Sequence, residues 1–187
     1  FNVDFNQVTP ELRSAAKAVN FGIIYGKSDF GLAQDLNISQ KKAKEYIESY
    51  FNKYETIKAF MDHIVSEAED KGYSTTIFNR RRYIPEIKSS NFVEKNRGKR
   101  AAMNAPIQGS AADIIKIAMV NVYNRLKEKG LKSRLILQVH DELIVEATAD
   151  ELTQVEVLLR EEMENAVNLG VDLKVDLNIG KSWYETK

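Results

Sequence analysis

Four side chains at intervals of four residues carry the clearest sign of chemistry in this sequence: Arg13, Lys17, Phe21 and Tyr25. Residues four apart lie above one another on an α-helix, so they would form one stripe, cationic at its start and aromatic at its end. The positive end of a helix attracts phosphate, and the rings offer surfaces on which a sugar or base can stack. The alternative is an ordinary helix with solvated cations and buried aromatic rings.

A second group of polar residues lies in the stretch QVHDELIVE, where two apolar segments meet. The carboxylates of Asp141 and Glu142, beside His140, are suited to hold hard divalent cations through oxygen. The alternative is that Asp141 forms the turn and His140 is its hydrogen-bonded neighbour. A phosphohydrolase metal site built on His140 and Asp141 would need more histidine ligands. The chain has only one other histidine, His63, so we reject this interpretation.

A third pattern lies in GKRAAMNAPIQGS, where Arg100, Asn104 and Gln108 again recur every four residues. Amide side chains both donate and accept hydrogen bonds, which suits base edges in a minor groove, and Arg100 suits a phosphate or a template base. The alternative is a role in helix capping or in hydrogen bonds between helices. We expect a kink or a break in the helix at Pro106, within this stripe.

The composition fits a globular protein with a sizeable core. The chain has 187 residues, of which 43% are hydrophobic. It has no cysteine, which excludes disulfides and thiolate metal sites, and no apolar run of membrane-spanning length, so no membrane partner is expected. The formal net charge is zero, which argues against a wholly basic surface.

The charges are nevertheless segregated along the chain. Cations dominate residues 79–100, and acids dominate residues 141–166, where Arg160 is the one basic residue. This asymmetry favours an anion-binding surface in the first region and cation chemistry in the second. Chance unevenness of solvated helix faces is the alternative.

The elements that would position these residues are helical in the first half and mixed in the second, so the predicted fold class is α+β. Thr9 is a good N-cap for a helix that starts at Pro10, and Gly26 is a plausible end. The other predicted helices are 28–36, 39–54, 55–72, 90–129 and 149–170, and the predicted strands are a ribbon around Asn79 and the segments 133–139, 142–147 and 171–180.

Together the motifs resemble the A-family DNA polymerases. RSAAKAVNFGIIYG is similar to the family's fingers-helix motif, QVHDELIVE to its palm motif with a catalytic aspartate, and RAAMNAPIQGSAADIIK to the palm helix that contacts primer-template. The resemblance covers essentially the whole chain in the family's order. It implies a helical fingers subdomain over residues 1–90 and, over residues 91–187, part of a palm built on an antiparallel sheet with packed helices.

The resemblance also implies roles for the residues. Arg13 and Lys17 would bind the phosphates of the incoming deoxynucleoside triphosphate, with Lys17 near the leaving pyrophosphate. Phe21 would lie by the sugar and discriminate against dideoxynucleotides, and Tyr25 would lie beside the nascent base pair.

The remaining roles concern DNA and metal. Asp141, supported by Glu142, would ligate Mg²⁺ and carry two-metal catalysis, and the DNA contacts would be made by Arg100, Asn104, Gln108 and His140. The resemblance further implies primer-template DNA as a partner and a cytoplasmic, nucleoid-associated location.

One departure from the family pattern limits the expected activity. The family's other catalytic aspartate lies upstream of the fingers helix, in a motif resembling Asp-Tyr-Ser-Gln-Ile-Glu-Leu-Arg, and no such stretch occurs here. We therefore expect a C-terminal piece of a longer polymerase that is inactive alone, with an incomplete palm sheet whose edge invites self-association. The alternatives are a nucleotide- or DNA-binding module without catalysis and a structural scaffold.

Overall fold

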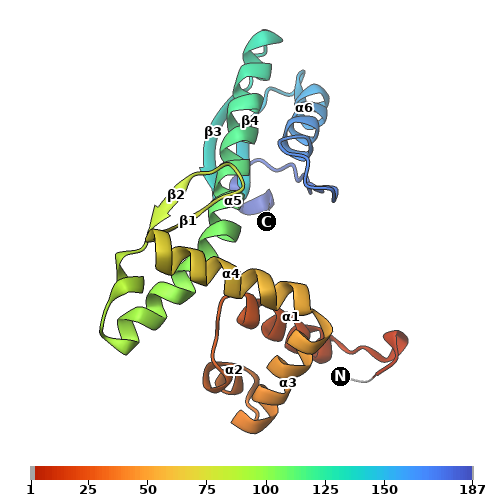
Figure 1. Ribbon diagram of the computed structural model, residues 1–187. Helices are drawn as coiled ribbons and strands as arrows, with labels where there is room; N and C mark the ends of the chain where they lie inside the picture. The colour runs from red at the N-terminus through yellow and green to blue at the C-terminus, as the bar shows by residue number, and fades with distance from the viewer. Residues whose placement is uncertain (1–2, 187) are drawn as a thin grey trace. The chain divides into compact units, whose positions relative to one another are not determined.

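The computed structural model describes residues 3–186 and divides the chain into two compact units, Phe1–Gly109 and Ser110–Lys187. Figure 1 shows the elements in chain order. The first unit holds η1 (Phe5–Gln7), α1 (Pro10–Ile24), α2 (Asp29–Leu36), α3 (Gln40–Lys53), α4 (Glu55–Lys71), β1 (Tyr73–Thr75), β2 (Arg81–Tyr83), η2 (Pro85–Lys88) and the first half of α5 (Phe92–Glu128). The second unit holds the rest of α5, β3 (Arg134–Val139), β4 (Glu142–Glu146), α6 (Leu152–Glu164) and η3 (Trp183–Thr186). The predicted α+β class is confirmed.

Helix α1 begins and ends where the sequence predicts. The Thr9 side chain accepts a hydrogen bond from the Leu12 N–H at 3.3 Å, and Pro10 occupies the first turn, where its missing N–H costs nothing. Gly26 follows the C-cap residue Tyr25 with φ +70°, a conformation that glycine adopts without steric penalty. The helix thus has a defined start and a defined end.

The helices α1, α2 and α3 share an apolar core. Its buried members are Val19, Ile23, Leu32, Ala33 and Ala43. The Tyr50 hydroxyl of α3 also donates a hydrogen bond to Asn20 Oδ1 of α1 at 2.7 Å. One face of α1 is therefore held against its neighbours, and the remaining face is open to solvent.

The ribbon predicted around Asn79 is confirmed as the antiparallel pair β1–β2, in which Tyr73 pairs with Tyr83. Asn79 has φ +60°, which asparagine tolerates better than most residues. A second core lies beside this hairpin and joins α4, η2 and α5; its buried members are Ile64, Ala68, Ile84, Ile87 and Ala102.

A kink or a break in the helix was expected at Pro106. Helix α5 is not broken there, because it continues through Pro106. Proline at 106 cannot donate to the carbonyl of Ala102, four residues earlier. The Ser74 hydroxyl of β1 donates to that carbonyl instead, at 3.2 Å in a buried position. A hydrogen bond from another element therefore satisfies the acceptor that the proline leaves without its helical partner.

The second unit is built on the hairpin β3–β4, the C-terminal half of α5 and α6. Its buried core consists of Val122, Leu126, Val155, Leu158 and Leu159, and the half-buried side chains that pack on it from the hairpin include Leu135, Leu143 and Val145. The strands are antiparallel, and their register shifts between Leu135 and Leu137. None of the helices in the described part of the chain has the length and apolar content needed to cross a bilayer.

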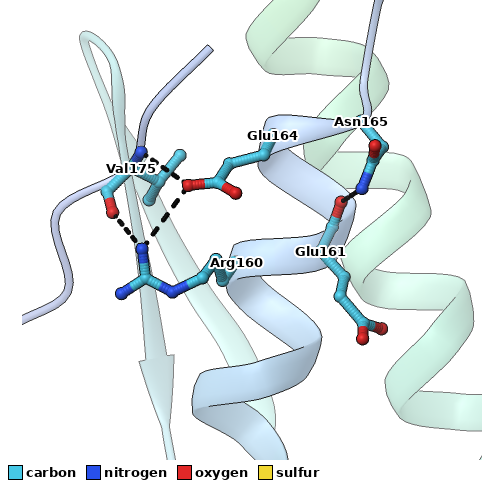
Figure 2. Close-up of polar contacts among 5 residues, drawn as sticks. All are labelled: Arg160, Glu161, Glu164, Asn165 and Val175. Carbon is cyan, nitrogen blue, oxygen red and sulfur yellow. Dashed lines mark hydrogen bonds and ion pairs between the residues drawn. The ribbon is translucent and has the colours of Figure 1, made fainter. Parts of the chain in front are cut away.

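The prediction of a last strand over residues 171–180 is wrong, and the predicted helix 149–170 is shorter, ending at Glu164. Figure 2 shows why no ladder forms at Val175: side chains of α6 bind its main chain. The Arg160 guanidinium donates to the Val175 carbonyl at 2.7 Å, and the Val175 N–H donates to Glu164 Oε1 at 3.1 Å. The segment keeps its alternating exposure but has no strand partner among the described residues.

Candidate functional site

The α1 ridge, as it is called below, consists of four exposed residues: Arg13, Lys17 and Phe21 of α1, and Tyr25, the C-cap residue of that helix. Phe21 is 51% exposed and Tyr25 is 37% exposed. Their rings stack, with centroids 6.2 Å apart and planes inclined by 21°. The alternative of buried aromatic rings therefore does not hold. The ridge presents two cations and then a double aromatic surface to solvent.

Gly22, next to Phe21, lies on the side of α1 that packs against the rest of the protein. It is buried, and a methyl group there would lie 3.4 Å from Leu32 Cδ1 of α2 and 3.5 Å from Lys27 Cδ. These are ordinary van der Waals distances. Gly22 thus lies where α1 packs on α2, and these contacts do not require a glycine.

The aromatic end of the ridge lies next to the start of the polar stripe on α5. A methyl group on Gly26 would overlap Met103 Cε and would lie 3.1 Å from Arg100 Cγ. Gly26 directly follows Tyr25, so this tight packing places the Tyr25 main chain against the turn of α5 that carries Arg100. Sequence reasoning missed Met103, because an apolar residue inside a helix gives no sign of which element it contacts.

The polar stripe itself is only partly open. Arg100 and Gln108 are exposed, and Asn104 between them is half-buried. Within residues 3–186, no donor reaches the buried oxygen Oδ1 of Asn104. A buried acceptor without a donor costs about 1–3 kcal/mol, so a ligand that supplied a donor here would gain that energy on binding.

In the second unit, His140 and Asp141 form the two-residue turn between β3 and β4, where Val139 pairs with Glu142. His140 has φ +52°, and the Gln138 side-chain amide donates to the His140 carbonyl at 2.7 Å. Asp141 is therefore a turn residue, as the structural alternative proposed. The same turn holds its carboxylate exposed at the tip of the hairpin.

Glu142 begins β4 and is held by a residue that sequence reasoning missed. The indole Nε1 of Trp183 donates to Glu142 Oε2 at 3.2 Å, across 41 positions of sequence. Trp183 is the one tryptophan of the chain, which is the signal that could have drawn attention to it.

The fit of this turn to a metal ion is partial. In the part of the chain that the structure describes, no three acidic or histidine side chains gather to hold a metal. Asp141 offers a hard oxygen donor of the kind that Mg²⁺ prefers, and Mg²⁺ commonly takes only one or two carboxylates from protein. Asp141 thus fits as one ligand of such an ion, and the described residues by themselves do not complete a metal site.

The comparisons with known proteins agree with one another. The family model for DNA polymerase family A matches residues 1–185. The chain is 55% identical over 187 residues to DNA polymerase I of Caldicellulosiruptor bescii and 56% identical over 187 residues to that of Bacillus caldotenax. These matches cover all of this chain but 22% and 21% of the relatives, so the chain spans about a fifth of their length.

A solved structure shows the same fold. The POL domain of Pol1 from M. smegmatis, in complex with DNA primer-template and dNTP, is 47% identical and has a TM-score of 0.94. The match covers 100% of this chain and 33% of that one. The chain therefore belongs to DNA polymerase family A.

Proposed function

We propose that this chain supplies the fingers (residues 1–90) and the C-terminal part of the palm (residues 91–187) of a DNA polymerase. That polymerase would transfer a deoxynucleotidyl group from a deoxynucleoside triphosphate to a primer 3′-hydroxyl, with Mg²⁺. The observation that carries the proposal is the exposed α1 ridge, with two cations followed by a stacked pair of rings. The M. smegmatis Pol1 domain, solved with primer-template and dNTP, supports it.

The ridge would bind the triphosphate and the nucleoside at its two ends. Arg13 and Lys17 carry charges that complement the phosphates, with Lys17 one turn closer to the rings. Phe21 would contact the sugar, and Tyr25 the nascent base pair. Because Val19 and Ile23 anchor the opposite face in the core, the ridge need not reorganise to receive its ligand.

The stripe on α5 would contact primer-template. Arg100 would bind a phosphate or a template base, and the Asn104 and Gln108 amides would bind base edges. The buried acceptor Asn104 Oδ1 supports this role because it has no donor among the described residues. Gly26 and Met103 would keep Arg100 beside the aromatic end of the ridge.

The turn at 140–142 would act on the primer end. We propose that Asp141, supported by Glu142, ligates Mg²⁺ and that His140 lies near the primer. The ions would align the attacking and leaving oxygens and offset the charge that develops on the phosphoryl group. Within residues 3–186 no third acidic or histidine side chain joins Asp141 and Glu142 in a cluster, so these two carboxylates would not hold two ions unaided. We therefore expect the isolated chain not to extend primers.

A chimera tests the function. The matching 187-residue segment of the B. caldotenax enzyme is replaced by this chain, and the product is called the polymerase chimera below. It should extend a primer with Mg²⁺. Asp141→Ala should abolish extension and leave primer-template binding intact, whereas Asp150→Ala, at another exposed acid, should not reduce extension. A folded, DNA-binding chimera without extension would contradict the proposal, and extension by the isolated chain would contradict its expected inactivity.

The second candidate is a nucleotide- or DNA-binding module without catalysis. It is favoured by the lack of a three-residue acidic or histidine cluster within residues 3–186. The same experiment separates the two functions, because a pure binding module has no extension for Asp141→Ala to remove.

We also infer that the isolated chain self-associates through the β3–β4 sheet. Among the described residues each strand pairs only with the other, and Ile136 of β3 is 56% exposed. An unpaired, apolar strand edge is a template for another chain. Sedimentation should show concentration-dependent association that Ile136→Lys weakens; a monomer at all concentrations would refute it.

A further inference from the structure

The C-terminal residues 178–186, called the C-terminal hook below, contain Trp183, whose indole binds the carboxylate of Glu142, next to Asp141. Trp183 Nε1 lies 3.2 Å from Glu142 Oε2, both within the second unit. A hydrogen bond to an ionised acceptor is stronger than a neutral one and restricts the side chain that accepts it. The bond therefore limits the positions of the Glu142 carboxylate.

The hook is locked by its own hydrogen bonds. The Thr186 hydroxyl donates to the Trp183 carbonyl at 2.8 Å, and the Asn178 amide donates to the Thr186 carbonyl at 3.1 Å. The Lys181 N–H donates to the Glu185 carboxylate at 2.7 Å. A methyl group on Gly180 would lie only 2.8 Å from Glu185 Cβ, so residues 180 and 185 can approach this closely because Gly180 has no side chain. The position of Trp183 is thus set locally.

Core packing does not account for this arrangement. No residue of η3 is buried, and Trp183 itself is 38% exposed. The hook thus adds no buried side chain to the apolar core, whereas its indole N–H binds the Glu142 carboxylate.

We propose that Trp183 is a positioning residue that holds Glu142 in place beside Asp141. The inference rests on the proposed function, in which these two carboxylates serve Mg²⁺. Residues that hydrogen-bond a metal-binding carboxylate without touching the metal orient that carboxylate. Mutating them commonly lowers metal affinity or activity about 10–100-fold. Trp183 has this relation to Glu142, because its indole donates a neutral N–H to the carboxylate.

The contact is tested on the full chain by fluorescence. Trp183 is the one tryptophan, so indole emission reports on this position alone. Glu142→Ala, which removes the acceptor, should change the intensity or wavelength of that emission. Glu146→Ala is the matched control, since Glu146 lies on the same strand and pairs with Arg134. Equal spectra for the wild type and Glu142→Ala would overturn the contact.

The role is tested in the polymerase chimera. Trp183→Phe keeps a ring and removes the N–H. We expect kcat to fall about tenfold at unchanged dNTP KM, and Mn²⁺ binding, followed by electron paramagnetic resonance, to weaken by a similar factor. Tyr184→Phe, at an 88% exposed neighbour in the hook, should change neither.

Two further variants separate positioning from folding. Gly180→Ala keeps the indole but displaces the hook, and it should act in the same direction as Trp183→Phe. In a Glu142→Ala background, Trp183→Phe should have little further effect, because the two residues would act through one hydrogen bond. An inactive wild-type chimera would overturn the proposed function. An active chimera whose kcat and Mn²⁺ affinity are unchanged by Trp183→Phe, or additive losses in the double variant, would overturn this inference alone.

Discussion

The Ser74 hydroxyl donates to the Ala102 carbonyl at 3.2 Å and so replaces the helical donor that Pro106 removes from α5. Ser74→Ala should destabilise the chain by about 1–3 kcal/mol, because it leaves a buried carbonyl without a donor. Chemical denaturation of the two proteins measures this difference.

Pro106→Ala provides the matching test of the same relationship. Alanine restores an N–H that can donate to Ala102, so Ser74→Ala should cost less in the Pro106→Ala background than in the wild type. Equal costs in both backgrounds would show that the serine does not replace the missing donor.

Two glycines four residues apart should respond oppositely to alanine. Gly22→Ala meets only ordinary contacts and replaces glycine within a helix, so it should stabilise the chain by up to about 1 kcal/mol. Gly26→Ala places a side chain at φ +70° and onto Met103, so it should destabilise by more than about 1 kcal/mol. Thermal unfolding of both variants provides the measurement, and a loss of stability in Gly22→Ala would contradict the contacts described for α1 and α2.

If the proposed role of the α1 ridge is correct, Lys17→Ala should weaken binding of a deoxynucleoside triphosphate to the isolated chain about tenfold, because it would remove a charge-assisted contact to phosphate. Lys41→Ala, at an exposed lysine of α3, is the control and should have little effect. Isothermal titration at low and high salt should show the difference shrinking as salt screens the charges. Unchanged affinity in Lys17→Ala would contradict the proposed binding of triphosphate by the α1 ridge.

Glu151 should make the stability of the chain depend on acid pH. Its carboxylate accepts hydrogen bonds from the Ser133 hydroxyl and from the N–H groups of Lys132 and Ser133, which lower its pKa to about 2. A depressed pKa adds stability that is fully present above the ordinary value of 4.5 and is lost as the pH falls toward 2. The wild type should therefore lose more stability than Glu151→Gln between pH 4.5 and 2 in denaturation at each pH. Parallel curves would contradict this assignment.

Local rules were enough to predict much of the fold. Thr9, Ser28 and Ser39 cap helices through their own side-chain oxygens, and Gly72 ends α4 at φ +79°. The turn at His140 and Asp141 also follows from its two flanking apolar segments. These features depend on neighbours a few residues away, so the sequence around them contains their causes.

The sequence also predicts that the residues of the α1 ridge share one helix face, because side chains four residues apart lie on the same face whatever packs on the other. That these residues are exposed, and that Phe21 stacks on Tyr25, follows from the packing of α1 on α2 and α3. The role of the ridge stays a prediction.

Tertiary structure decided the points at which a distant residue replaces a local partner. Pro106 does not break α5 because Ser74 reaches Ala102, and Val175 joins no strand because side chains of α6 bind its main chain. Glu142 meets Trp183 across 41 positions of sequence. By itself, the sequence determined the helix caps, the turns and the periodic faces; tertiary contacts decided which donors and acceptors meet, because hydrogen bonds depend on distances in space that local spacing does not specify.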